Sequence, residues 1–273
     1  MWKYATVFSY LGTDYCGWQK QKGSAALGKP SIQESIELAL CQMTGEKVSV
    51  VGSGRTDSGV HAWGQVAHFI LKGKYWDPKI LQRGMNGILP MSIRALDVYP
   101  TPLDFHAQRS AEKKQYSFYF QQGPCALPYL EPLSWWIRKK LDLDAMNQAA
   151  HALLGEHDFK AFQASGAKPG PTVRKILEAE MLTESIVFPG AGLSSLPGAL
   201  GSFCLVRFRV VGTGFLKQMV RGIAGTLLQV GEGRRPASCI SEILKTRDRS
   251  QVGPTAPARA LWLERVWYSE DAH

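Results

Sequence analysis

The sequence has few of the residues that hold metal ions or disulfide frameworks. Its 273 residues include five cysteines, an odd number, and no two of them form a C-x-x-C pair. The six histidines never stand four residues apart, so no helical pair is available to bind a metal ion. We therefore expect no metal site and no disulfide framework, and we expect thiols that stay reduced in a cytoplasmic compartment.

Long apolar runs and targeting signals are also missing. The apolar stretch at residues 4–12 is interrupted by polar side chains and does not have the pattern of a secretory signal. Residues 185–206 carry no charge, yet two prolines and four glycines within them argue against a membrane-spanning helix. We interpret residues 185–201 as an insertion at the surface and expect no membrane association.

No glycine-rich segment has the spacing that cradles a nucleotide cofactor. A G-x-G pattern occurs at residues 52–54, but neither G-x-G-x-x-G nor a G-K-[ST] ending follows it. We therefore expect the protein to work without a cofactor.

What the sequence does contain is apolar material and an excess of positive charge. Hydrophobic residues make up 45% of the chain, and the formal net charge is +9. Residues 1–104 carry 11 Lys/Arg against 8 Asp/Glu, and residues 105–273 carry 21 against 15, so the excess is not a tail. A basic surface spread in this way favours a polyanionic partner, nucleic acid first and an acidic membrane second.

Apolar residues alternate in several segments and recur at helical spacing in others. Strands are expected at residues 3–10, 47–52, 65–71, 93–98, 115–120, 173–182, 203–211 and 261–268. Helices are expected after Ser31, after Asp77, over 146–154, over 216–228 and after Pro236. This interleaving predicts an α/β or α+β fold, and it leaves the strand order open. A weakly marked boundary divides the chain into residues 1–105 and 106–273.

One segment, residues 52–62, is far more specific than the rest. It reads Gly-Ser-Gly-Arg-Thr-Asp-Ser-Gly-Val-His-Ala and places Asp57 on a glycine-rich loop, two residues after Arg55. Glycine is used where the backbone turns tightly or approaches another body closely. A carboxylate on such a loop can stay ionised and touch a substrate, although an aspartate in this setting is commonly only a turn residue.

This string resembles the catalytic loop of the TruA-type tRNA pseudouridine synthases, whose pattern is close to G-x-G-R-T-D-x-G-V-H-A. Further motifs, in the family's order, extend the resemblance over nearly the whole chain. They lie at residues 9–21, 64–69, 86–90, 105–116, 155–162, 173–174, 215–228 and 255–263. The chain departs from the family pattern at Gln108, Gln218, Gly222 and Ala260.

The resemblance implies a fold and an activity. The fold would consist of two similar mixed α/β halves, with a largely antiparallel central sheet, flanking helices and a basic active-site cleft between them. The activity would be the isomerisation of uridine to pseudouridine in tRNA, on the 3′ side of the anticodon stem-loop. The protein would act as a cytoplasmic homodimer.

The resemblance also assigns roles to four residues. Asp57, in the half at 1–105, would be catalytic, and Arg55 would hold a nucleotide that has left the base stack. In the other half, Tyr116 would stack on the target base and Arg221 would be the cationic partner of Asp57. From the residues alone, Tyr116 equally fits core packing and Arg221 equally fits a solvated helix face.

Other basic side chains are candidates for contact with the RNA backbone. They are Lys113, Lys114 and Arg249, and each of them equally fits a solvated surface charge. His61 and His157 are expected to be structural.

Three other functions stay open. The chain could be a catalytically silent RNA-binding module with exposed sheet aromatics, an isomerase of other RNA positions, or a hydrolase that releases free base. The intact Asp57 loop disfavours the first, and a single candidate carboxylate disfavours the last, because glycosidases generally use two. Asp57 itself could act as a nucleophile, as an electrostatic partner or as a base.

Overall fold

The computed structural model describes residues 1–20, 28–167, 169–184 and 203–269, and the expected insertion at 185–201 lies outside these ranges. The chain divides into two compact units. The first comprises Met1–Gln115 together with Trp262–His273, and the second comprises Tyr116–Leu261. The end of the chain therefore returns to the unit in which the chain begins.

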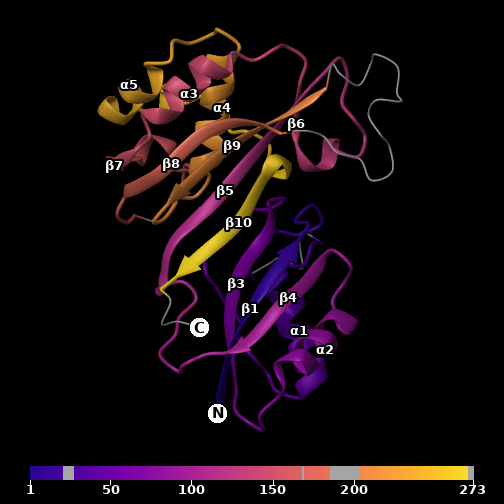
Figure 1. Cartoon of the computed structure of the whole chain (residues 1–273). Coiled ribbons are helices and arrows are strands. Elements are labelled where there is room, and N and C mark those ends of the chain that lie inside the picture. The colour runs from indigo at the N-terminus through magenta and orange to yellow at the C-terminus, as the bar shows by residue number, and fades with distance from the viewer. Residues whose placement is uncertain (21–27, 168, 185–202, 270–273) are drawn as a thin grey trace. The chain divides into compact units, whose positions relative to one another are not determined.

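The first unit is built on a sheet. Its strands are β1 (Trp2–Tyr10), β2 (Val51–Gly52), β3 (His61–Leu71), β4 (Ile93–Pro100), β10 (Leu261–Tyr268) and the start of β5 (Ala111–Gln122). Across the sheet the order is β4-β1-β3-β10 (Figure 1). β1 is antiparallel to both β3 and β4, and β2 is antiparallel to β3, whereas β10 runs parallel to β3.

Two helices cover this sheet, α1 (Ile32–Thr44) and α2 (Pro78–Ile88), and they pack against each other (Figure 1). The Ser31 side chain caps α1 by accepting from the Glu34 amide, and Gly45 ends the helix at a φ of 74°. Asp77 caps α2 ahead of a proline in its first turn. These local signals place both helices where the sequence predicts them.

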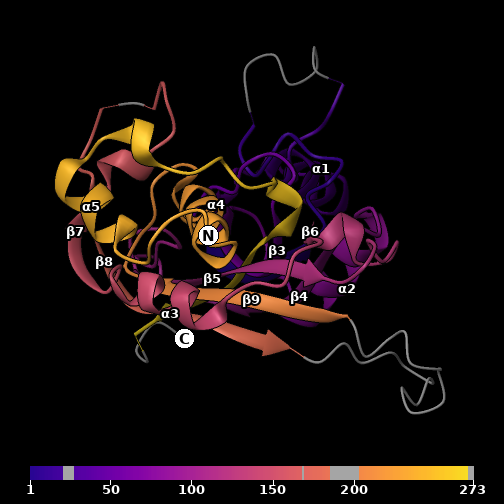
Figure 2. The ribbon, with the colours of Figure 1, turned by 90° about the horizontal axis from the view of Figure 1, so that it is seen from above.

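The second unit holds the rest of β5 together with β6 (Trp135–Ile137), β7 (Gly155–Asp158), β8 (Val173–Glu184) and β9 (Cys204–Gly212). β8 is antiparallel to both β7 and β9, and β6 is parallel to β5. The helices α3 (Leu143–His151), α4 (Met219–Gly231) and α5 (Cys239–Thr246) are grouped with these strands (Figures 1 and 2). α3 packs against β8, α4 and α5.

The predicted fold class is confirmed: the fold is mixed α/β, and the strand pairing is mostly antiparallel. The expected strand at 47–52 was too long, since only Val51 and Gly52 pair. The backbone of Val50 pairs with side chains of α1 and not with a neighbouring strand. The Val50 N–H donates to Glu37, and the Val50 C=O accepts from Gln33. No helix in the described part of the chain is long and apolar enough to cross a membrane.

Candidate active site

The Asp57 loop joins β2 to β3 in the first unit. Asp57 is half-buried and Arg55 is exposed, so both side chains can reach solvent. The turn is closed by the Val60 N–H, which donates to the Asp57 C=O at 3.1 Å, and Gly59 adopts a φ of 80°. The loop thus presents a carboxylate and a guanidinium two residues apart.

A buried hydrogen-bond network fixes the loop from beneath. The Tyr10 hydroxyl lies 2.8 Å from Thr56 Oγ1, and both residues are nearly inaccessible to solvent. Gln65, fully buried on β3, donates to the Gly54 C=O at 2.9 Å and accepts from the Ser53 hydroxyl at 2.6 Å. Because buried polar groups are costly to leave unpaired, this network holds the residues on both sides of Arg55 in one conformation.

Two glycines let the segment after β1 lie directly against the loop. A Cβ at Gly12 would stand 2.0 Å from the Val60 carbonyl oxygen, and one at Gly17 would stand 2.7 Å from that of Thr56. Gly17 also has a φ of 107°, which other residues rarely adopt. The Trp18 N–H then donates to the Thr56 C=O at 3.0 Å. The motif at residues 9–21 and the Asp57 loop at residues 52–62 are therefore one packed structure.

Lys114, predicted to contact the RNA backbone, is engaged inside the protein. Its Nζ donates to the Ser53 C=O and lies 3.3 Å from the position that a Cβ on Gly54 would take. Burial lowers the pKa of this amine. The contact makes Lys114 a support of the Asp57 loop and places a cation directly beside it.

The F-H-A segment after β4 is fastened to the same unit. The Ala107 N–H donates to Nδ1 of His68, and Lys3 Nζ donates to the Phe105 C=O at 2.8 Å. Burial, followed by the charges of His106 and Lys3, lowers the pKa of His68 to about 4. His68 is therefore a neutral acceptor at ordinary pH. His61 likewise accepts from the Gly12 N–H at 2.9 Å and is fully buried, in line with its expected structural role.

Tyr116 and Arg221 lie in the second unit. Tyr116 is buried and meets Phe215 edge-on, with ring centroids 5.0 Å apart. Arg221, half-buried on α4, donates from Nε to the Ala256 C=O at 2.7 Å, and its own C=O accepts from the Ala256 N–H. The alternative interpretation of Arg221 as a solvated helix residue does not fit this half-buried, hydrogen-bonded position.

The two remaining backbone candidates also make contacts within the protein. Lys113 Nζ lies 4.9 Å from the ring centroid of Trp267, a cation–π contact. Arg249 is exposed and donates to the carbonyl groups of Ala161 and Gln163.

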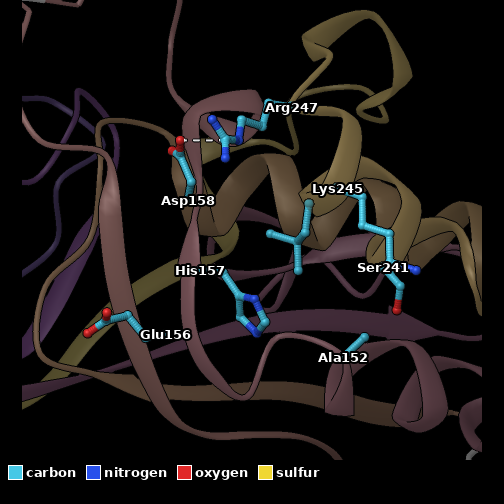
Figure 3. Close-up of a pocket in the computed structure, with 8 residues that line it drawn as sticks. Ala152, Glu156, His157, Asp158, Ser241, Lys245 and Arg247 are labelled. Carbon is cyan, nitrogen blue, oxygen red and sulfur yellow. Dashed lines mark ion pairs between the residues drawn. The ribbon is translucent and has the colours of Figure 1, made fainter.

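A hollow in the second unit lies between β7 and α5 and contains none of the predicted site residues (Figure 3). Asp158 and Arg247 form an ion pair across it at 3.4 Å. His157, beside them, lies 2.8 Å from the Leu154 carbonyl oxygen through its Nε2. In the described part of the chain, no three metal-ligating side chains gather in one place.

Comparison with known proteins identifies the family to which this chain belongs. A family described as tRNA pseudouridine synthase matches residues 7–108 and 149–269. The chain belongs to this family. The matched ranges include Arg55, Asp57 and Arg221, and Tyr116 lies between them.

Individual relatives match over almost their whole length. Proteins named tRNA pseudouridine synthase A from Myxococcus xanthus, Acetivibrio thermocellus and Geobacter sp. (strain M21) are 39%, 38% and 37% identical to this chain. The alignments cover 97%, 96% and 97% of this chain and 91%, 98% and 98% of the relatives, respectively.

Sequence reasoning missed Tyr10 and Gln65 as parts of the site. Both stand in stretches whose residue pattern predicts strands, and nothing in their immediate neighbours indicates a buried polar contact. One available signal is that the hydroxyl of a Tyr and the amide of a Gln need partners when they are buried in a sheet.

Proposed function

We propose that this protein isomerises uridine to pseudouridine in tRNA and that Asp57 is its catalytic residue. The observation that carries the proposal is the Asp57 loop: it holds a half-buried carboxylate on a backbone fixed by buried hydrogen bonds. Membership of the tRNA pseudouridine synthase family supports the same reaction. The enzyme is thus an isomerase, since its product has the composition of its substrate.

The reaction breaks the C1′–N1 bond of uridine and forms a C1′–C5 bond with the same base. Positive charge develops on the sugar as the first bond breaks, and a preorganised carboxylate stabilises such charge. One proton leaves C5 and one is gained at N1, so no water is consumed. Retention of the base explains why one carboxylate suffices where glycosidases use two.

The other predicted residues have supporting roles in this proposal. Arg55, exposed two residues before Asp57, holds the nucleotide that has left the stack. Tyr116 stacks on the target base, and Arg221 supplies a fixed cation to the reaction. Lys113 and Arg249 contact the RNA backbone, while Lys114 acts mainly by supporting the loop.

We further propose that the target uridines lie on the 3′ side of the anticodon stem-loop, that the enzyme is a homodimer, and that it works in the cytoplasm without a metal ion or cofactor. The relatives named tRNA pseudouridine synthase A support the choice of substrate. Mapping pseudouridine in tRNA from cells that lack the protein tests the positions.

The first prediction is that Asp57→Asn abolishes isomerisation and leaves tRNA affinity within about twofold of wild type. Binding rests on many phosphate contacts, so the loss of one acid changes it little. Single-turnover assays on transcribed tRNA measure the rate, and filter binding measures the affinity. Asp104→Asn, at an exposed acid of the same unit, is the matched control and should keep full activity. Substantial turnover by Asp57→Asn would show that the catalytic assignment is wrong.

A further inference from the structure

Trp63, on β3 close to the Asp57 loop, is a large aromatic side chain that the protein leaves exposed. Its exposed fraction is 54%, although tryptophan is among the side chains that gain most from burial. A half-exposed Trp gives up about 2 kcal/mol of burial free energy. Such an exposure is informative when the ring is also held in place.

The ring of Trp63 is held in place by a stack. It lies on Trp262 with centroids 4.9 Å apart and planes 16° apart, and Trp262 lies 4.4 Å from the ring of His61. Trp262 and His61 are buried, and His61 is fixed by the Gly12 amide. Because Trp262 covers one face of Trp63, the exposed area of Trp63 lies on its opposite face and its edges.

A rigid indole face that is packed on one side is suited to receive another flat ring on the other side. Aromatic side chains bind unpaired nucleobases in this way, without regard to sequence, because every base has a π-face. The net charge of +9 favours a polyanion as the molecule that brings such a ring.

Trp63 also lies near Asp57 in the chain, within reach of an RNA bound at the Asp57 loop. Trp63 follows Asp57 by six positions, so the two Cα atoms are at most about 20 Å apart, or about six nucleotide steps along a stacked strand. An RNA placed on the Asp57 loop is therefore long enough to reach this ring.

We propose that Trp63 is a stacking site for an unpaired nucleobase of the RNA substrate, a few nucleotides from the target uridine. The site binds a base by its π-face, and it adds affinity without neutralising a phosphate. The proposal rests on the proposed function, because the RNA is positioned by the Asp57 loop.

The test compares variants of Trp63 in tRNA binding across a salt series. Trp63→Leu keeps an apolar side chain and removes the ring, and it should weaken binding by about 5- to 150-fold, the range for one lost base–aromatic stack. Trp63→Phe should recover most of the affinity. The dependence of binding on salt should stay as in wild type, because no phosphate contact is lost.

Trp2→Leu is the matched control. Trp2 is also exposed, at 45%, and lies in the same unit, but it meets Tyr75 edge-on with planes 71° apart. Its ring is therefore not stacked on that of Tyr75, and its replacement should leave tRNA binding unchanged. Sedimentation of all variants checks whether the ring is instead covered by a second copy of the chain.

Three results for Trp63→Leu would each overturn the proposal. The variant could bind tRNA as tightly as wild type, its binding could depend less on salt than that of wild type, or it could form a smaller assembly than wild type in solution. If the Leu variant fails to fold, ultraviolet crosslinking of the wild-type protein to tRNA gives the answer. An adduct on the peptide that carries Trp63 supports the site, and adducts only elsewhere refute it. If the proposed function itself is wrong, the wild-type protein will make no pseudouridine in tRNA. That result is distinct from all of the outcomes for Trp63.

Discussion

At the scale of single residues, the site depends on side chains that never reach the substrate. The Tyr10 hydroxyl, Thr56 and Gln65 are buried and bonded to one another beneath the Asp57 loop. Catalytic groups must be held to within a fraction of an ångström, and a displacement of about 1 Å can cost about a hundredfold in rate. In the proposed mechanism, the buried network therefore serves catalysis as well as folding.

Replacing Tyr10 with Phe should lower both stability and turnover. The change leaves Thr56 Oγ1 without its bond to the Tyr10 hydroxyl, which costs about 1–3 kcal/mol of unfolding free energy, and it loosens the loop, which should lower the single-turnover rate at least about tenfold. Denaturant unfolding and single-turnover assays measure the two effects.

Tyr4→Phe is the control for this change. The Tyr4 hydroxyl also makes two hydrogen bonds, donating to the Trp76 C=O and accepting from its N–H, each at 2.9 Å. Its loss should cost similar stability without slowing the reaction. An equal loss of turnover in both variants would mean that the network below the loop has no specific role.

His68 gives the protein a dependence of stability on pH. Its pKa is lowered to about 4 in the folded state by burial and by the nearby charges of His106, Lys3 and Arg109, against an unfolded value of about 6.5. Between these values the unfolded state binds more protons than the folded state, so stability falls as the pH drops from about 6.5 to 4. The shift sets an upper limit of about 3 kcal/mol on this effect, which solvent screening reduces.

His68→Asn should remove most of this dependence. The Asn oxygen can still accept from the Ala107 N–H, whereas it cannot titrate in this range. Urea unfolding at pH 7, 5.5 and 4.5 measures the difference between the two proteins. A variant that loses stability toward acid as steeply as wild type would show that other groups control the effect.

At the scale of elements, the sequence predicts best what is local. The starts of α1 and α2 follow from Ser31 and Asp77, whose side chains bond the first turn of their own helices. The fastening of the Asp57 loop could not be predicted, because Tyr10 and Trp18 come from a distant part of the chain. Their hydrogen bonds to Thr56 form only in the folded protein, where Gly12 and Gly17 allow close packing. The eleven-residue string located the loop but not what holds it.

The start of α4 shows the same limit. The apolar spacing predicted a helix from residue 216, yet the helix begins at Met219, because Gln218 takes a left-handed conformation with a φ of 60°. Such a backbone costs a non-glycine residue about 1–2 kcal/mol. A pattern of side chains carries no signal for this backbone strain.

Gln218→Gly should therefore stabilise the protein by up to about 1 kcal/mol, since glycine adopts a positive φ without steric cost but adds freedom to the unfolded chain. Gln148→Gly, at an exposed position inside α3, is the matched control and should destabilise by about 1 kcal/mol. Thermal unfolding of both variants tests the opposite signs. Destabilisation by both changes would show that the Gln218 side chain contributes more than its strain costs.

At the scale of the whole molecule, positive charge is the property that we expect to bind the tRNA. The excess of +9 is spread over both halves of the sequence. Binding that rests on many phosphate contacts weakens steeply with salt, and each contact adds about one unit to the slope of log affinity against log salt. The salt slope therefore sorts basic residues into those that hold the RNA backbone and those that serve the reaction.

Arg221 and Arg249 should fall on opposite sides of this test. Arg249 is exposed, and Arg249→Ala should weaken tRNA binding and reduce the salt slope by about one unit. Arg221 is half-buried and its Nε is committed to the Ala256 C=O at 2.7 Å, so it is poorly placed to follow a phosphate. Arg221→Ala should instead lower the single-turnover rate at least about tenfold and leave the slope nearly unchanged. If Arg221→Ala flattens the slope and keeps the rate of the bound complex, α4 is a docking surface and Arg55 becomes the stronger candidate for the cation that assists Asp57.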